Sequence, residues 1–420
     1  MTSPDPVRRL WISSAGSSNH PIELPYSICV IARARSLLTE ERLRVYPRAV
    51  LVALGLALGG LVLSPNGVGT IHGDPGGDFR SFYAAGEIVR SGRAASLYDW
   101  STQLATQAAI TPGATRDFLP FAYPPFVALA YAPLSRLDFR LAYGLSTFGM
   151  VFMVYAAVLL LVPVFRRIGS QPLAVFVALL FFYPVLRAVG GQTSAVGIVL
   201  IALVWRCLHD ERELAAGAAM AFLFYKPQLA LPLICLAALL RRPKILVGFA
   251  GATALLYAVG AAVSGWSWLF EWWSQIGEFK QAQLGNLHNS ISVLGFVESL
   301  IGVGSPAAMG IGALLSAALA VGIALIWLQA RVSLNLRMAM TCCALVLIPP
   351  HSLYYDAGIA GLGLLVLADE RGWEDAKWIA ILYFAAYLTP LSKFVGFSLM
   401  FLLVVAMLLH LRSFSAAHSK

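Results

Sequence analysis

Charge is scarce in this chain of 420 residues: only 12% of them are Asp, Glu, Lys or Arg, whereas 59% are hydrophobic. Soluble domains carry roughly 25% charged residues, so this chain lacks the surface that would hold it in water. Its mean hydropathy is +0.75, and several apolar runs of about 15 to 25 residues are long enough to cross a bilayer core of about 30 Å. We therefore predict an all-α polytopic membrane protein whose solvent is the lipid bilayer.

Motifs for several kinds of chemistry are also missing. The chain has no P-loop, no GxGxxG after a strand, no HExxH and no GxSxG, which leaves nucleotide-driven, redox and zinc-dependent chemistry unsupported. Its five cysteines are an odd number with no metal-site spacing and no disulfide framework. We expect no cofactor and no metal.

The positive charge has an uneven distribution. Seven arginines precede the first apolar run, residues 49–63: Arg8, Arg9, Arg33, Arg35, Arg42, Arg44 and Arg48. The positive-inside rule keeps such a segment in the cytoplasm, and no aromatic-interleaved basic domain follows that would bind nucleic acid. The apolar stretch at 28–32 is too short for a cleavable signal peptide. We expect a poorly ordered cytoplasmic tail over 1–47, a single transmembrane domain over 48–411, and a cytoplasmic tail over 412–420, in the inner (plasma) membrane.

Further apolar segments predict about 10 to 13 spans in all; they lie at 121–134, 141–165, 172–186, 194–207, 214–240, 245–263, 291–303, 309–328, 338–348, 353–367, 378–388 and 394–411. Connectors with many charges are expected inside, at 166–167, 209–213, 241–244, 331–337 and 369–377. The connectors at 190–192, 266–289 and 349–356 then lie outside. This alternation requires 214–240 to enter the membrane and return at Lys226-Pro227, a break that is tolerated where it lines a cavity. The segments 121–134 and 291–303 can likewise be re-entrant.

The longest polar stretch, residues 64–120, becomes a large first extracytoplasmic loop. Its periodicity predicts amphipathic helices over 79–89 and 100–110 that lie on the membrane surface. Two glycines form a turn before Asp78, which then occupies the N-cap of the first helix. Asp78 is either a plain cap or a carboxylate that apolar surroundings make basic, able to take a proton from an acceptor hydroxyl. Asp99 is the predicted cap of the second helix.

Lys226 is an ionisable residue between two apolar runs. A lysine at mid-bilayer costs roughly 2.5 to 3.5 kcal/mol, so such a residue is a functional candidate. The ordinary alternative is snorkelling to an interface, which a hairpin turn at this point would allow. As a functional residue, Lys226 would bind a phosphate or carboxylate that enters from the membrane.

Weaker polar signals occur at the outer ends of other spans. Gln192 follows two glycines in a probable loop, and Asn289 and His351 belong to short polar clusters, the second of which also contains Asp356. A lone histidine is more often structural than catalytic. Four tryptophans, Trp266, Trp268, Trp272 and Trp273, form an interfacial aromatic belt, and their faces could also pack against a sugar ring.

Several of these segments follow one another in the order of a known family. The chain has Gly77-Asp78-Phe79 with Tyr83-Ala84-Ala85-Gly86, then Leu97-Tyr98-Asp99, Phe121-Ala122-Tyr123-Pro124-Pro125, Gly191-Gln192, Lys226-Pro227-Gln228, Asn289 and Pro350-His351-Ser352. Over about residues 48–411 this order resembles glycosyltransferase family 87 (the DUF2029 group), which includes polyprenol-phosphate-mannose-dependent mannosyltransferases of the GT-C fold.

The resemblance implies an inverting transfer of a sugar from a polyprenyl-phosphate donor to a hydroxyl of a glycolipid or glycan acceptor, on the extracytoplasmic face. Asp78 matches the position of the family's general base. We assign the donor phosphate and sugar to Lys226, Gln192, Gln228, His351 and Tyr123. We assign the acceptor or the rest of the pocket to Tyr83, Asn289 and Asp356.

One difference from the family and two other functions stay open. The mannosyltransferases tend to carry a Trp and paired His in the late outer loop, where this chain has His351-Ser352-Leu353-Tyr354-Tyr355-Asp356; this indicates another sugar or acceptor. A transporter or flippase for a lipid-linked or anionic solute could use Lys226 and the broken spans as a midplane site. A non-catalytic membrane scaffold is the third possibility, with Asp78 only a cap.

Overall fold

The computed structural model describes residues 39–63, 76–110, 118–282 and 284–417. Residues Leu43–Lys420 form one compact unit and Met1–Arg42 another, of which the structure describes only the beginning of a helix. The tail predicted over 1–47 therefore lies largely outside the described residues, as do parts of the predicted first loop, 64–75 and 111–117.

The described residues are helical, and they contain no β-sheet, only an isolated antiparallel bridge between Ser290 and Leu353. Five stretches of 20 to 23 residues are long and apolar enough to cross a bilayer. They belong to α2 (Glu40–Leu63), α6 (Phe139–Leu161), α12 (Pro243–Ser264), α15 (Pro306–Leu328) and a run made of α18 (Ala376–Ala385), η9 (Ala386–Leu391) and α19 (Ser392–Val395). Shorter apolar helices are α9 (Ser194–His209), α10 (Glu213–Phe222), α11 (Pro227–Leu239), α16 (Leu334–Leu347) and α20 (Leu399–Ala417). The prediction of an all-α polytopic membrane protein is confirmed.

Two predicted segments have different boundaries in the structure. The run 172–186 is not one helix: α7 (Pro172–Leu180) ends and α8 (Tyr183–Ala188) begins around Pro184, because proline has no N–H to continue the hydrogen-bond ladder. Helix α20 extends beyond Leu411 to Ala417, so it includes most of the residues predicted as a tail. Short elements complete this part: η4 (Ile168–Ser170), α17 (Gly361–Glu370) and η8 (Gly372–Asp375).

The connectors predicted to share the inner side meet one another. The Asp369 carboxylate accepts hydrogen bonds from the backbone N–H groups of Arg167 and Ile168, at 2.6 and 3.0 Å. Arg242 pairs with Glu213 across two other connectors at 2.8 Å. These contacts place the charged connectors at one end of the helices, as their grouping by charge predicted; which compartment that end faces stays a prediction.

The chain does turn back at Lys226. Helices α10 and α11 are separated by a single 3-10 turn, η5 (Leu223–Tyr225). The start of α10, at Glu213, and the end of α11, around Leu240, line the same cavity, whereas Lys226 and Pro227 line a different one. The hairpin predicted from the alternation of charged connectors is therefore confirmed.

Small residues fix how this hairpin packs on α12. A Cβ atom on Gly217 of α10 would lie 2.0 Å from the carbonyl oxygen of Ile245, and one on Gly248 of α12 would lie 2.0 Å from that of Leu214. Only glycine allows this approach of two backbones, which is the usual device for helix contacts in lipid. The close packing holds α10, the first arm of the hairpin, against α12.

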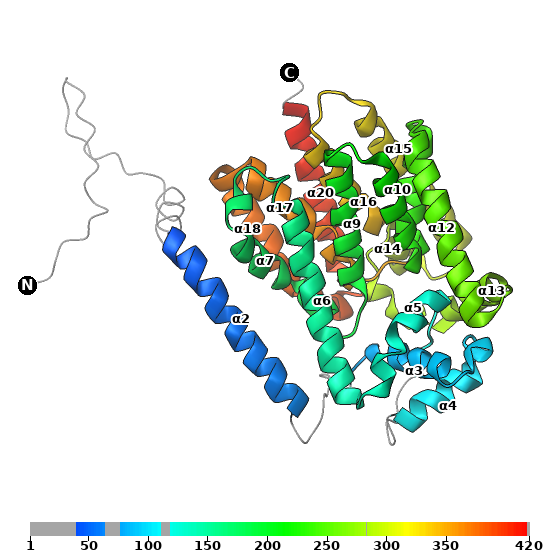
Figure 1. Ribbon diagram of the computed structural model, residues 1–420. Helices are drawn as coiled ribbons and strands as arrows, with labels where there is room; N and C mark the ends of the chain where they lie inside the picture. Colours follow the sequence, from blue (N-terminus) through cyan, green and yellow to red (C-terminus); the bar gives the residue numbers. More distant parts are fainter. Residues whose placement is uncertain (1–38, 64–75, 111–117, 283, 418–420) are drawn as a thin grey trace, which may run out of the picture. The chain divides into compact units, whose positions relative to one another are not determined.

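The remaining elements come from distant parts of the chain. They are α3 (Phe79–Arg90), η2 (Ala94–Ser96), α4 (Trp100–Ile110), α5 (Pro125–Tyr131), η3 (Leu134–Arg136), α13 (Trp268–Ala282), η6 (Leu284–Asn289), α14 (Val293–Ile301) and η7 (Tyr354–Gly358). Helices α3, α4, α5 and α13 gather at one end of α6 and α12 (Figure 1). The predicted helices over 79–89 and 100–110 are confirmed as α3 and α4.

Candidate functional site: a cavity at the Lys226 turn

A cavity of about 560 Å³ opens at the Lys226 turn, within the 300 to 1,000 Å³ typical of small-ligand sites. Its polar and aromatic lining includes Tyr123, Tyr225, Lys226, Gln228, Ser290, Glu298, His351, Tyr355 and Asp356. Its apolar lining includes Leu231, Pro232, Trp272, Leu287 and Ile348. A mostly apolar wall with a few convergent polar groups is the usual form of a ligand site.

Lys226 is held in this cavity by a buried ion pair. Its ammonium nitrogen lies 2.6 Å from Oδ1 of Asp356, and only 6% and 7% of the two side chains are exposed. Ser194, at the start of α9, donates to the same oxygen at 2.8 Å. The Nζ atom also lies 5.2 Å above the ring of Tyr355. An ammonium has three donors, so Lys226 keeps donors for a ligand while Asp356 fixes its position.

The same turn is bordered by stacked aromatic rings. Tyr123 and Tyr225 are nearly parallel, at 8° with ring centroids 6.5 Å apart, and Phe82 of α3 lies 5.0 Å from Tyr123. Tyr225 donates to the carbonyl of Thr193 at 3.1 Å. Trp272 closes another side, donating from its indole nitrogen to the carbonyl of Ala122 at 3.1 Å. Of the four tryptophans predicted to form a belt, Trp272 lines the cavity.

Asp78 begins α3 but does not cap it with its side chain. Gly76 and Gly77 have φ of 73° and 51°, a conformation that glycine adopts at little cost, so they form the predicted turn. Asp78 is at the N-cap position, yet it has helical φ and ψ and makes no side-chain capping bond. Its carboxylate is therefore not used by its own helix. Gly191 packs against this turn, since a Cβ there would be 3.1 Å from the carbonyl oxygen of Gly76.

The Asp78 carboxylate stands beside the cavity and is only partly exposed. Burial raises its pKa above the usual value, and the positive charges of Lys226 and Arg80 offset part of that rise. Tyr123 and Tyr355 of the cavity wall also feel its charge. Asp78 does not itself line the cavity, so a group deprotonated by Asp78 would have to extend toward it from the cavity.

His351 adds a neutral imidazole to the wall. Burial lowers its pKa, with the nearby charge of Asp356 acting in the opposite direction and that of Lys226 in the same one. A histidine with a lowered pKa is uncharged at pH 7 and can donate one hydrogen bond and accept another. His351 can therefore bind a hydroxyl or a phosphate oxygen without adding charge.

Of the residues assigned from the sequence, the cavity brings together Lys226, Gln228, His351, Tyr123 and Asp356. Besides Asp78, three others lie outside its lining. Gln192 has a buried side chain. It directly precedes Thr193, whose carbonyl accepts the bond from Tyr225. The Asn289 amide lies 3.2 Å from Nε2 of His288, next to the cavity residue Ser290.

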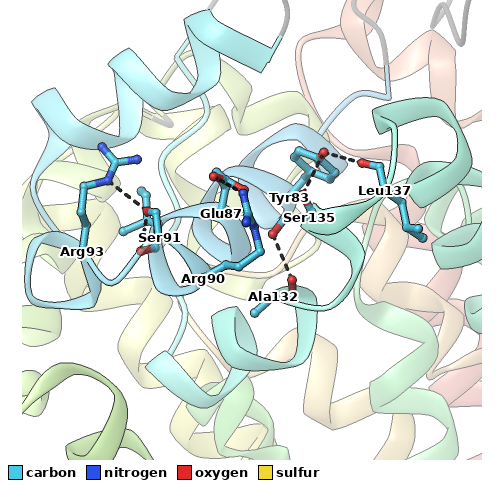
Figure 2. A network of polar contacts seen from close by, with 9 residues as sticks. Tyr83, Glu87, Arg90, Ser91, Arg93, Ala132, Ser135 and Leu137 are labelled. Atoms are coloured by element: carbon cyan, nitrogen blue, oxygen red, sulfur yellow. Dashed lines mark hydrogen bonds and ion pairs between the residues drawn. The ribbon is translucent and has the colours of Figure 1, made fainter.

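Tyr83 is the third residue outside the lining. Its hydroxyl donates to the carbonyl of Leu137 at 2.7 Å and to that of Ser135 at 3.3 Å. Figure 2 shows this tyrosine among the contacts that tie α3 to the segment after α5. These bonds give Tyr83 a structural task, and its assignment to the acceptor remains an untested prediction.

Three polar residues near the cavity escaped the sequence analysis. Glu298 lines the cavity from within the apolar helix α14 and is 7% exposed. Arg80 is buried near Asp78, and Ser194 completes the Lys226–Asp356 contact. An acidic residue in an apolar run is the same signal that singled out Lys226, so Glu298 could have been found. No group of three or more potential metal ligands occurs in the described residues; the expectation of a metal-free site stays a prediction.

Comparison with known proteins decides the family of this chain. A family model for glycosyltransferase family 87 matches residues 121–350, which hold most of the cavity lining. The chain belongs to glycosyltransferase family 87. No curated protein and no solved structure matches it. The resemblance predicted from the ordered motifs is confirmed, and this family 87 protein is a membrane glycosyltransferase.

Proposed function

We propose that this family 87 glycosyltransferase moves a sugar from a polyprenyl-phosphate donor to an acceptor hydroxyl, with inversion at the anomeric carbon. The observation that supports this most is the cavity at Lys226, where a positioned ammonium and an Asp78 with a raised pKa flank a volume of about 560 Å³. The leaving group needs a cation, and the acceptor needs a base. Lys226 lines this cavity, and Asp78 lies beside it on a different element.

The reaction is a single displacement. The acceptor oxygen forms a bond to the anomeric carbon while the bond from that carbon to the phosphate oxygen breaks. The acceptor proton passes to Asp78, whose raised pKa makes it a stronger base than an ordinary aspartate. The electron pair leaves with the lipid phosphate, whose charge Lys226 stabilises as it develops. Tyr123, Gln228 and His351 orient the donor.

The surroundings of the site fit a lipid-linked donor. Leu231, Pro232, Leu287 and Ile348 give part of the cavity an apolar wall, against which the first prenyl units of a donor can lie. We infer that the cavity faces the extracytoplasmic side of the inner membrane, because the charged connectors collect at the other end of the helices. A GT-C arrangement, with catalysis on outer loops above the spans, is consistent with this.

A flippase for a lipid-linked solute is the second candidate, and one observation favours it. A further cavity of about 480 Å³ is lined by Glu213 of α10, Leu236 of α11 and Met338 of α16, three residues near the ends of these helices that lie away from the Lys226 turn. Cavities at both ends of shared helices are what alternating access requires. The ion pair of Lys226 would then bind cargo instead of a leaving group.

The deciding experiment uses purified protein in lipid vesicles with radiolabelled polyprenyl-phosphate sugars and a membrane-glycolipid extract. We expect wild type to move label into a new product and the Asp78→Asn variant not to do so. Asp99→Asn is the matched control, since it makes the same change in the same loop at a residue that caps its helix.

Two outcomes would contradict the proposal. Label that crosses the vesicle membrane unconsumed, in wild type and Asp78→Asn alike, would establish the flippase. Transfer that continues at the wild-type rate in Asp78→Asn would remove Asp78 as the base while leaving the transferase.

A further inference from the structure

Glu298 is a carboxylate that the proposed reaction does not use. It lies in α14, whose other residues are Val293, Leu294, Gly295, Phe296, Val297, Ser299, Leu300 and Ile301. Although glutamate is normally exposed, this side chain is buried and lines the same cavity as Lys226. A buried acidic side chain in an apolar helix is costly unless something binds it.

The cavity has two carboxylates in its lining, and they differ in their partners. Asp356 is bonded to Lys226 and Ser194. Glu298 accepts one bond in the described structure, from the backbone N–H of Gly304 at 3.3 Å, and no basic side chain among the described residues lies within ion-pair distance of it. An ionised carboxylate offers about four acceptor positions, so most of the capacity of Glu298 is left for a ligand.

Glu298 is held at a fixed place relative to Asp356. The start of α14 is tied to the segment before η7: Ile291 donates its backbone N–H to the carbonyl of Ser352 at 2.9 Å, and the Ser292 hydroxyl donates to that of Pro350 at 3.2 Å. On the same helix, Phe296 stacks on Phe401 of α20 with ring centroids 4.1 Å apart. The helix is thus fixed on two sides, which suits a residue that must meet a rigid ligand.

Glu298 and Lys226 serve different parts of a ligand. The ammonium of Lys226 pairs with Asp356, whereas Glu298 lies on another element, α14, outside ion-pair distance, so the two stand at separate places in one cavity. A group that meets Lys226 is an anion, whereas a group that meets Glu298 must donate hydrogen bonds. A sugar phosphate has both, because its hydroxyls are donors and its phosphate is the anion.

We propose that Glu298 accepts hydrogen bonds from hydroxyls of the donor sugar and so determines which sugar the enzyme takes. This rests on the proposed function, which places the donor in this cavity. A site that hydrogen-bonds a substrate hydroxyl rejects analogues that lack it or point it elsewhere, since the buried partner is then left unpaired. Glu298 is therefore a specificity-determining residue of the donor site.

The test compares two lipids in a binding assay that needs no catalysis. Short-chain polyprenyl phosphate and the same lipid carrying mannose, glucose or arabinose are titrated into detergent-solubilised protein, and affinity is read by native mass spectrometry. Glu298→Gln should lower the affinity for the preferred glycosylated lipid by about 10-fold to 100-fold and leave the affinity for the bare phosphate lipid unchanged. Lys226→Met should lower the affinity for both lipids. Glu374→Gln, at an exposed glutamate, is the control and should change neither.

A substrate change checks that the effect is direct. Gln can still accept the bond from Gly304, so Glu298→Gln should keep the melting temperature of wild type. Donor analogues that lack one ring hydroxyl at a time are then compared. One of these losses should lower the affinity of wild type but should not lower further the affinity of Glu298→Gln. The inference is wrong if the variant binds the glycosylated lipid with the affinity of wild type, or if its affinity for both lipids falls equally. It is also wrong if no deoxy analogue shows this dependence. Binding of neither lipid by wild type would instead overturn the proposed function, and the inference with it.

Discussion

Asp78 and Asp99 precede the helices α3 and α4, and the two side chains have different environments. Asp99, before α4, accepts hydrogen bonds from the backbone N–H of Thr102 at 2.9 Å and from the hydroxyls of Ser101 and Thr102, both at 2.6 Å. These bonds lower the pKa of Asp99 to about 2. Asp78, before α3, makes no capping bond, and burial raises its pKa. The Asp99 carboxylate is exposed and caps its helix, whereas the Asp78 carboxylate is partly buried and makes no capping bond.

The difference shows what separates a structural aspartate from a chemical one. Both positions have the same sequence signal, an Asp before a helix. At Asp99 the side chain stabilises its own helix through bonds that favour the charged form. At Asp78 the helical backbone conformation turns the carboxylate away from that task, and the surroundings disfavour its charge. A group that costs stability where it stands is a candidate for function.

The largest expected effect comes from removing the Asp78 charge. Asp78→Asn should lower the transfer rate by about 10²-fold to 10⁴-fold, the usual contribution of a general base, and at pH 7 it should raise the melting temperature. The second effect follows from the sign of the pKa shift. Because the folded pKa is above the unfolded value of about 3.8, the folded state loses stability as pH rises through that range and does not regain it above.

Rate assays and thermal melts of wild type and Asp78→Asn between pH 4 and 8 check this pair of effects. The gain in melting temperature should shrink as the pH falls toward 4, because the folded state then holds the Asp78 carboxyl protonated and the unfolded state begins to protonate it as well. An active and less stable variant would show that Asp78 is a cap after all, and the contrast with Asp99 would disappear.

Removing the Lys226 charge should have the next largest effect on the transfer rate. It also tests the difference between Asp78 and Asp99, because the Lys226 charge acts on the pKa of Asp78. Lys226→Met should lower the transfer rate by about 10²-fold, as expected for the loss of one group that stabilises developing charge. It should also move the acid limb of the pH–rate profile to higher pH, because the Lys226 charge now offsets part of the rise in the Asp78 pKa. A slower enzyme with an unmoved limb would mean that another group titrates in that limb.

Much of the fold was predictable because a few residues determine its turns and helices. The turn at Gly76-Gly77, the helices over 79–89 and 100–110 and the reversal at Lys226-Pro227 all follow from local chemistry or from the alternation of charged connectors. The break of 172–186 was not predicted, since a proline can begin a helix as well as end one. The packing of α10 on α12 through Gly217 depends on where two backbones cross, which no local pattern specifies.

The site was predictable as a set of residues but not as a set of contacts. Lys226 and Asp356 were each singled out, yet their ion pair joins residues 130 positions apart and was not expected. The sequence predicted a cap at Asp99 and left Asp78 open between a cap and a base, because the backbone angles and burial that separate the two are not specified by the local sequence. Tyr83 was assigned to the acceptor or pocket, and the bond from its hydroxyl to the Leu137 carbonyl was not expected; the assignment itself stays a prediction.

A third prediction asks whether the chemistry belongs to Asp78 or to α3 as a whole. Tyr83 is on the same helix, one turn further along, and donates to the Leu137 carbonyl. Tyr83→Phe should cost about 1 kcal/mol of unfolding free energy, the net value of one hydrogen bond, and leave the transfer rate within about two-fold. Chemical denaturation in detergent and the transfer assay measure the two. A large loss of rate at unchanged stability would return Tyr83 to the acceptor site.

The smallest effect is expected at Asp99. Asp99→Ala removes the acceptor for the Thr102 N–H and both hydroxyls, so it should lower the melting temperature slightly and leave transfer unchanged. Because the folded pKa of about 2 is below the unfolded value, the contribution of this carboxylate is fully present above about pH 4 and is lost as the pH falls toward 2. The melting temperatures of wild type and Asp99→Ala should therefore converge in acid. At pH 7 the difference has the opposite sign to that of Asp78→Asn, because Asp99→Ala melts below wild type and Asp78→Asn above it. Loss of transfer in Asp99→Ala comparable to that in Asp78→Asn would mean that α4 belongs to the site and that capping does not separate the two aspartates.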